Sequence, residues 1–222
     1  MRRLARTLSI PTIYLLWTLL VLYPNPVLLA RSVDRSLNPQ PDPEAVREWA
    51  RQLPDDPAYI ERQVLDQYVP YAVPWQTLGV PWYFPTAREV VAMGRGDCQG
   101  RMLVLASLLK AKGIPYHLEA SFDHIWVSYP HKIPNALERT SLSIMKNSGN
   151  GVQMQMPAEW DWRDSVRIER EYFLDPFPPG RLALLCAGWG AVLFRRRLVK
   201  LLIRLRLWRS MPAVPSSESG VV

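Results

Sequence analysis

No charged residue lies between Arg6 and Arg31, and the 24 residues that separate them are mostly apolar. A helix that spans a membrane needs about 20 predominantly apolar residues, so this window is long enough. A cleaved signal peptide has the same basic start and apolar middle, but its cleavage site prefers small residues, and Val27–Ala30 contains two leucines. We therefore expect residues 1–35 to form an uncleaved membrane anchor, with a signal peptide as the alternative.

A second apolar stretch lies near the other end of the chain. Residues 182–194 are uncharged, but at about 1.5 Å per residue such a helix is too short for a bilayer core unless its flanking arginines extend to the surface. The next segment, 195–209, mixes basic residues with Leu, Ile, Val and Trp, so as a helix it could lie on an anionic leaflet or dock on protein. We predict an apolar segment and a basic amphipathic helix over 182–209, and a disordered tail over 210–222.

The net charge of +7 is concentrated at the two ends of the chain. Residues 31–181 carry 17 basic and 19 acidic side chains, and this balance argues against a groove for nucleic acid. Basic residues beside a membrane span tend to stay in the cytoplasm. With three arginines before the first apolar stretch and Arg195–Arg197 after the second, both termini are predicted to be cytoplasmic and the middle extracytoplasmic.

The middle of the chain, residues 36–181, carries signals for both helices and strands. Helices are predicted from their capping residues or first turns, with starts at Asp42, Asp56, Thr86 and Cys98. Strands are predicted over 116–121, 124–129 and 167–174. These elements predict a single α+β domain.

The sequence indicates a nucleophile at Cys98 and a base at His124. A thiolate is a strong nucleophile, and a cysteine in the first turn of a helix lies at the positive end of the helix dipole. Backbone N–H groups at the same helix end can stabilise negative charge on an attacked carbonyl, and Gly94 and Gly96 let the preceding loop turn sharply. His124, on a later strand, can supply the base that such a nucleophile needs. The competing interpretation is a buried structural cysteine.

The sequence GRGDCQGRMLVLASLLKAKGIPYHLE, followed by HIWVSY, resembles the transglutaminase-like domains of the papain-like cysteine superfamily. The upstream stretch YAVPWQTLGVPWYFPTAREVVAMG is also similar to the approach of that family to its cysteine. The resemblance covers residues 40–130 well and 131–180 poorly. It implies a helix-borne cysteine packed on an antiparallel sheet, with Cys98 as the nucleophile and His124 as the general base.

The resemblance also implies a third residue that orients the histidine. The family pattern of aromatic-x-Leu-Asp-Pro matches YFLDP and so predicts Asp175 for this role. Asp175 lies 51 positions after His124, which is more than the family usually shows, and Asp161 and Asp164 are alternatives. Candidates for an indole or amide that stabilises the oxyanion are Trp75, Gln76 and Trp82. His117 and His131 make no ligand spacing with the cysteines, so no metal or other cofactor is expected.

Three functional hypotheses follow. The first is a membrane-anchored bacterial enzyme that transfers an acyl group from a protein or peptide amide through a thioester on Cys98. Its acceptor would be water, as in a peptidase or amidase, or an amine, as in a crosslinking transglutaminase. The second is a catalytically silent module of the same fold that binds a protein partner at the membrane. The third is a basic adaptor that works through residues 195–209. In each case both termini would contact membrane lipid, at the inner or plasma membrane.

Overall fold

The computed structural model describes residues 10–135, 137–138, 140–147, 152–158, 161–194 and 197. Within these residues it contains nine α-helices and a four-stranded antiparallel sheet, which confirms the predicted α+β class. The chain divides into two compact units: one contains α1 (Ile10–Leu22) and α9 (Pro179–Leu193), and the other spans Leu22–Pro179. Apart from Arg197, the predicted basic helix over 195–209 and the tail over 210–222 lie outside the described residues.

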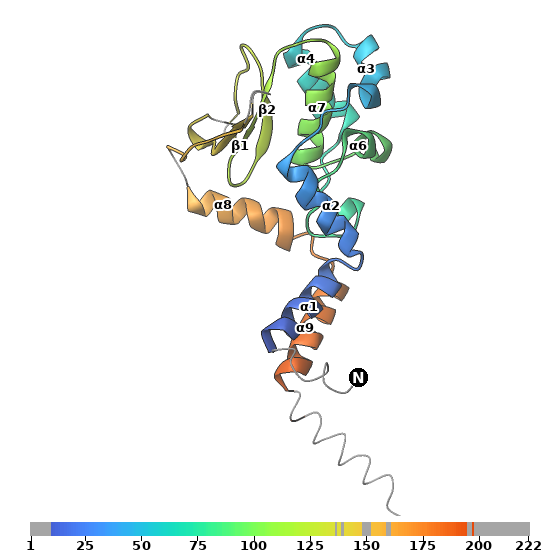
Figure 1. The fold of residues 1–222 in the computed structure, drawn as a ribbon, viewed down its shortest axis with the longest axis vertical. Helices are drawn as coiled ribbons and strands as arrows, with labels where there is room; N and C mark the ends of the chain where they lie inside the picture. Colours follow the sequence, from blue (N-terminus) through green and yellow to red (C-terminus); the bar gives the residue numbers. More distant parts are fainter. Residues whose placement is uncertain are drawn as a thin grey trace, which may run out of the picture. The chain divides into compact units, whose positions relative to one another are not determined.

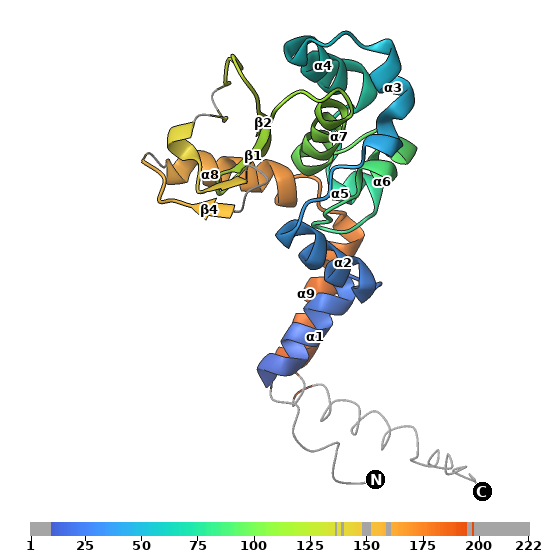
Figure 2. The ribbon, with the colours of Figure 1, turned by 45° about the horizontal axis from the view of Figure 1, so that its top comes forward.

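Helix α7 (Cys98–Ala111) lies at the centre of the larger unit. Nine of its residues between Gly100 and Leu109 are buried, because α7 is covered by helices on one side and by the sheet on the other. Figure 1 and Figure 2 show this arrangement, with α7 between the sheet and helices α3, α4 and α6. The elements that pack on α7 are η2 (Pro43–Val46), α3 (Arg47–Gln52), α4 (Pro57–Gln63), η3 (Val64–Tyr68), α6 (Ala87–Met93) and strand β2 (Ile125–Ser128).

The predicted helix starts are confirmed by their caps. The side chains of Asp42 and Asp56 accept hydrogen bonds from the first turns of η2 and α4, and Thr86 forms a capping box with Glu89 at the start of α6. Asp97 caps α7 by accepting from the Gly100 N–H at 3.0 Å. Local sequence therefore determines where these helices begin.

The sheet has the order β2-β1-β3-β4, and all neighbouring strands are antiparallel. Its strands are β1 (His117–Ala120), β2 (Ile125–Ser128), β3 (Met145–Asn147) and β4 (Val152–Met154). The first two confirm the strands predicted over 116–121 and 124–129. Leu118 and Val127 are register partners, and both are buried in the core that includes α7. The β1–β2 hairpin is thereby fixed to the helix that begins at Cys98.

The strand predicted over 167–174 is wrong, because this segment is helical. Helix α8 (Trp162–Glu169) is capped by Asp161 and continues as the π-helical turn η5 (Arg170–Leu174). Its less exposed side chains are Ser165, Ile168, Tyr172 and Phe173, and the first three recur every three or four residues. That spacing is helical, and it outweighs the strand preference of the aromatic residues.

The first apolar stretch does not form one straight helix. Helices α1 and α2 (Pro26–Leu37) are separated by a break at residues 23–25, and only as a pair do they have the length and composition of a membrane span. Within the described residues no single helix meets that test. The second half of the pair belongs to the larger unit, since Arg35 on α2 bonds Glu89 and Tyr83 at 2.8 Å each.

The remaining short helices of the larger unit are α5 (Pro74–Thr77) and η4 (Thr140–Leu142). In the smaller unit, α1 and α9 contact each other directly. The Trp189 indole N–H donates to Thr18 Oγ1 at 3.0 Å, and the Tyr14 hydroxyl donates to the Trp189 carbonyl at 3.3 Å. The two apolar helices at opposite ends of the sequence thus form one helix pair.

Candidate active site

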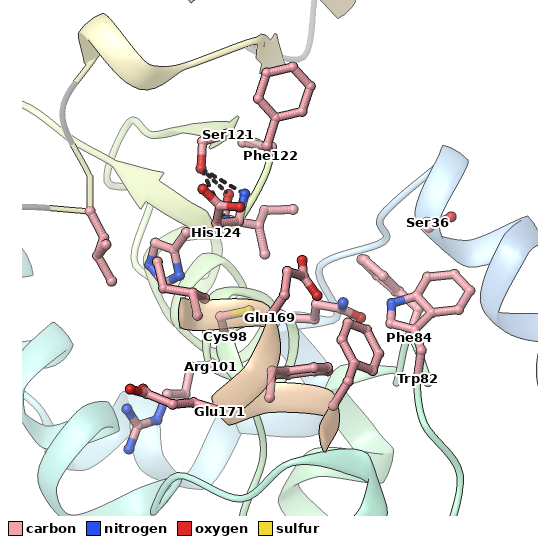
Figure 3. Close-up of a pocket in the computed structure, with 18 of the residues that line it drawn as sticks. Ser36, Trp82, Phe84, Cys98, Arg101, Ser121, Phe122, His124, Glu169 and Glu171 are labelled. Carbon is pink, nitrogen blue, oxygen red and sulfur yellow. Dashed lines mark hydrogen bonds between the residues drawn. The ribbon is translucent and has the colours of Figure 1, made fainter. Parts of the chain in front are cut away.

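Cys98 and His124 line the same cavity, which has a volume of about 610 Å³. Figure 3 shows the Cys98 sulfur at the start of α7 and the His124 imidazole on the neighbouring wall. Other walls are formed by Trp82 and Phe84 and by side chains of α8 and η5. The structure therefore brings the predicted nucleophile and the predicted base to one site.

The position of His124 is set by the turn between β1 and β2. Its backbone N–H donates to Ser121 Oγ at 3.0 Å, and its carbonyl accepts from the Ser121 N–H at 2.8 Å. The imidazole stacks on Trp126, with ring centroids 6.0 Å apart and an interplanar angle of 11°. Because Trp126 is buried in the sheet, the ring has a rigid support.

The surroundings of Cys98 favour the neutral thiol. Burial raises the pKa of Cys98 to about 12, and the neighbouring carboxylate of Asp97 adds to this increase. The backbone N–H groups of Ile125, Gln99 and Cys98 itself act in the opposite direction, but their effect is smaller. The start of α7 therefore does not activate the thiol on its own, because desolvation outweighs the stabilisation of the thiolate by these backbone N–H groups. The sulfur needs a base that removes its proton during the reaction.

Tyr172 connects η5 to the start of α7. Its hydroxyl donates to Asp97 Oδ2 at 2.5 Å, and Asp97 is 3% exposed. Burial raises the pKa of Asp97, although the Tyr172 hydroxyl and the backbone N–H groups favour its ionised form. Glu171 and Phe173 of the same turn also line the cavity. Segment η5 thus closes one side of the cavity beside Cys98.

The acidic group that faces His124 is Glu138. Its Oε1 lies 3.8 Å from His124 Nε2, which is within ion-pair distance but longer than a hydrogen bond in a complex with substrate. Burial alone would raise the pKa of Glu138, but the His124 ring and the ammonium of Lys132 lower it overall. Glu138 is therefore ionised at neutral pH. It lies in an irregular loop after β2, where the sequence has no periodic signal.

The three predicted aspartates have other partners. Asp175 Oδ1 accepts from Arg170 Nε at 3.3 Å, Asp164 pairs with Arg167 at 3.0 Å, and Asp161 caps α8 by accepting from the Arg163 N–H at 2.9 Å. All three lie on or beside the α8–η5 segment, and none is among the residues that line the cavity. The structure places Glu138, and not these aspartates, at the Nε2 edge of His124.

Of the three candidates for oxyanion stabilisation, Trp82 lines the cavity. With the Gln99 amide oriented to suit its neighbours, its oxygen accepts from Trp82 Nε1 at 2.8 Å. The indole of Trp75 donates to the Phe173 carbonyl at 3.2 Å, and Gln76 is exposed. Gln99 also lines the cavity. The sequence does not indicate this residue, because the orientation of its amide depends on the contact with Trp82, which lies in another segment of the chain.

Among the described residues, no group of three or more His, Cys, Asp or Glu side chains could hold a metal ion. Both cysteines, Cys98 and Cys186, are free thiols. Comparison of the chain with protein-family models, with curated proteins and with solved structures finds no match.

Proposed function

We propose that this protein is a transglutaminase-like acyl-transfer enzyme in which Cys98, His124 and Glu138 act together. The observation that carries the proposal is their arrangement: a free cysteine at a helix start shares a cavity with a histidine whose Nε2 edge faces an ionised carboxylate. Nucleophilic catalysis by cysteine needs these three components in this order. Because Nε2 of His124 faces Glu138, Nδ1 is the nitrogen left to take the proton of the thiol.

The reaction begins with attack of the Cys98 sulfur on the carbonyl carbon of an amide while His124 removes the thiol proton. Backbone N–H groups at the start of α7 can donate to the oxyanion. The C–N bond then breaks, the leaving amine takes the proton from the imidazolium, and a thioester remains on Cys98. Water or an amine next attacks the thioester, His124 takes the proton of that acceptor and returns it to the sulfur, and the C–S bond breaks. Hydrolysis is the default outcome, and an amine acceptor gives a crosslink.

A second function is favoured by the environment of the thiol. Burial and Asp97 keep Cys98 protonated, and η5 closes one side of its cavity. These features suit a silent module that uses the fold to bind a protein partner. The two functions differ in one measurable property, which is whether Cys98 is acylated faster than an ordinary buried thiol.

The test is acylation of the purified full chain by p-nitrophenyl acetate. An active enzyme should release a burst of p-nitrophenol close to one equivalent, with the acetyl group located on Cys98 by mass spectrometry. His124→Ala should slow this step by about 10²- to 10⁴-fold, the usual effect of removing a general base. Cys186→Ser is the matched control and should keep the burst. Acetylation that is absent, or equally fast without His124, would favour the silent module.

We also propose that the chain is held at a membrane by its apolar helices. The support is the apolar composition of the α1–α2 pair and of α9, together with the basic residues beyond both. A reporter fused after Val222 should behave as cytoplasmic, and one inserted at Gly149 as exported. Recovery of the untagged protein in the soluble fraction after cell lysis would contradict this placement.

A further inference from the structure

Three mostly buried charged side chains, Glu61, Lys132 and Glu138, form a cluster beside the Nε2 edge of His124. Lys132 is the central member, and its side chain is 5% exposed. Its Nζ lies 2.7 Å from Glu61 Oε1, 3.2 Å from Glu138 Oε1 and 2.8 Å from the Val127 carbonyl oxygen. The ammonium donates hydrogen bonds to Glu61 and to the Val127 carbonyl, and it forms an ion pair with Glu138.

The chain makes an unusual turn to bring Lys132 to this position. His131, the preceding residue, has a φ of 64°, in the left-handed region that costs a non-glycine residue about 1–2 kcal/mol. The turn is closed by the Lys132 N–H, which donates to the Tyr129 carbonyl at 3.2 Å. As a result Lys132 folds back under β2 and reaches the carbonyl of Val127.

Glu61 fixes Lys132 from the helical side of the domain. It lies on α4, which packs on α7. One of its carboxylate oxygens accepts from Lys132, and the other accepts from the Tyr129 hydroxyl at 2.5 Å. The ammonium is therefore held by a helix and by a strand, which are both rigid elements.

Stability alone is a poor explanation for this arrangement. Burying an ion pair removes two charges from water, and apolar side chains of similar volume are often at least as stable in its place. Glu138, by contrast, lies in a loop, and a loop residue needs an anchor if its carboxylate is to stay beside a catalytic group. Among the described residues, Lys132 is the one whose side chain contacts Glu138, Glu61 on α4 and the Val127 carbonyl of β2.

We propose that Lys132 is a positioning residue, which holds the Glu138 carboxylate at Nε2 of His124 and is itself fixed by Glu61 and the Val127 carbonyl. This inference rests on the proposed function and adds a second layer to the site. The charged and titratable groups around Glu138 are His124 just before β2, Lys132 and Tyr129 in the turn, Glu61 on α4, Tyr71 between η3 and α5, and Cys98 and Arg101 on α7. Together with other side chains, all of these except Lys132 and Tyr129 line a second cavity of about 140 Å³.

The test uses the double variant Lys132→Met/Glu61→Gln. It removes the Lys132 ammonium and the Glu61 carboxylate together, so neither charge of this ion pair is left buried without the other. The full chain carries Cys186→Ser, so Cys98 is its remaining thiol, and the alkylation rate of Cys98 by iodoacetamide is followed from pH 5 to 9. When Glu138 is displaced or protonated, the His124 imidazolium loses its counter-charge. The plateau rate should then fall about tenfold, and the acid limb should move to lower pH by roughly one unit, as it should in Glu138→Gln.

The matched control is Lys112→Met. Lys112 is also a mostly buried lysine with one carboxylate partner, Asp55 at 2.6 Å, but it lies at the far end of α7 from Cys98. A double variant that keeps the plateau rate and acid limb of this control would overturn the inference. If circular dichroism shows that the double variant does not fold, Lys132→Arg is measured instead. Because it retains the positive charge, it should preserve the pH profile of alkylation. A shift of the acid limb as large as in Glu138→Gln would contradict the proposal.

The same measurements distinguish this inference from the proposed function. If the parent protein has no acid limb that His124→Ala removes, the proposed function itself fails. If the parent has that limb and the double variant does not move it, only the role of Lys132 fails.

Discussion

The two halves of the candidate site are built in different ways. Cys98 and His124 lie on a buried helix and on a hairpin that packs against it, and apolar contacts such as Leu118 with Val127 hold these elements together. Glu138 and Tyr172 come from a loop and from a π-helical turn, and charged or polar contacts hold them. The first half should therefore determine whether the domain folds, and the second half whether the thiol reacts.

The largest effect should come from a cavity in the first half. Leu108 on α7 is fully buried, and Leu108→Ala should lower the free energy of unfolding by about 2–5 kcal/mol. Leu174 in η5 is 65% exposed, so Leu174→Ala should change it by less than about 0.5 kcal/mol. Urea denaturation of the full chain, followed by tryptophan fluorescence, measures both. Equal losses would mean that η5 is as much a part of the folding core as α7.

The next prediction tests whether Glu138 or Asp175, the aspartate that the sequence favours, orients His124. Glu138→Gln keeps the shape of the side chain but removes the charge at His124, and it should slow acylation of Cys98 by about a hundredfold. Asp175 pairs with Arg170 and is mostly exposed, so Asp175→Asn should change the rate by less than about twofold. The p-nitrophenyl acetate burst measures both variants. The reverse order of the two rates would restore Asp175 as the orienting acid.

The same division separates what the sequence predicts from what it does not. Asp97, Cys98 and the helix after them have local signals, namely a capping residue, a continuous apolar run and a glycine at the end. Strand β2 of the hairpin likewise follows from a short run of apolar and β-branched residues. Each signal lies within a few residues of the structure that it specifies, and for that reason the Cys98 helix and the His124 hairpin could be predicted.

Glu138 and Lys132 have no such signals. Their positions depend on a left-handed turn at His131 and on Glu61, which precedes Lys132 by 71 residues in the sequence. The segment from Arg167 to Leu174 is predicted as a strand, whereas the structure shows a helix followed by a π-helical turn. Long-range polar contacts and the choice between two periods in a short segment are set by tertiary packing, which a single sequence does not reveal.

The smallest effect tests the point where the two halves meet, at Asp97 between the Gly100 N–H and the Tyr172 hydroxyl. Asp97→Asn keeps a helix cap and a polar partner for Tyr172 but removes the charge that helps to raise the pKa of Cys98. Without that charge the pKa should fall, so alkylation of Cys98 by iodoacetamide above pH 8 should become about two to five times faster. The matched control is Asp42→Asn, which changes a cap at η2, in another part of the domain.

The same variant should change the pH dependence of stability. Burial raises the pKa of Asp97 above its ordinary value of 3.8, so the folded protein binds this proton more tightly than the unfolded chain does. The stabilising contribution of Asp97 is therefore complete below about pH 4 and is lost as the pH rises through the folded-state pKa. Asparagine does not titrate, so the advantage of Asp97→Asn in thermal midpoint over the parent should grow from pH 4 to pH 7. A variant that instead becomes less stable than the parent over this range would show that the ionised carboxylate is needed between Gly100 and Tyr172, and that the hydrogen bonds there outweigh the cost of burial.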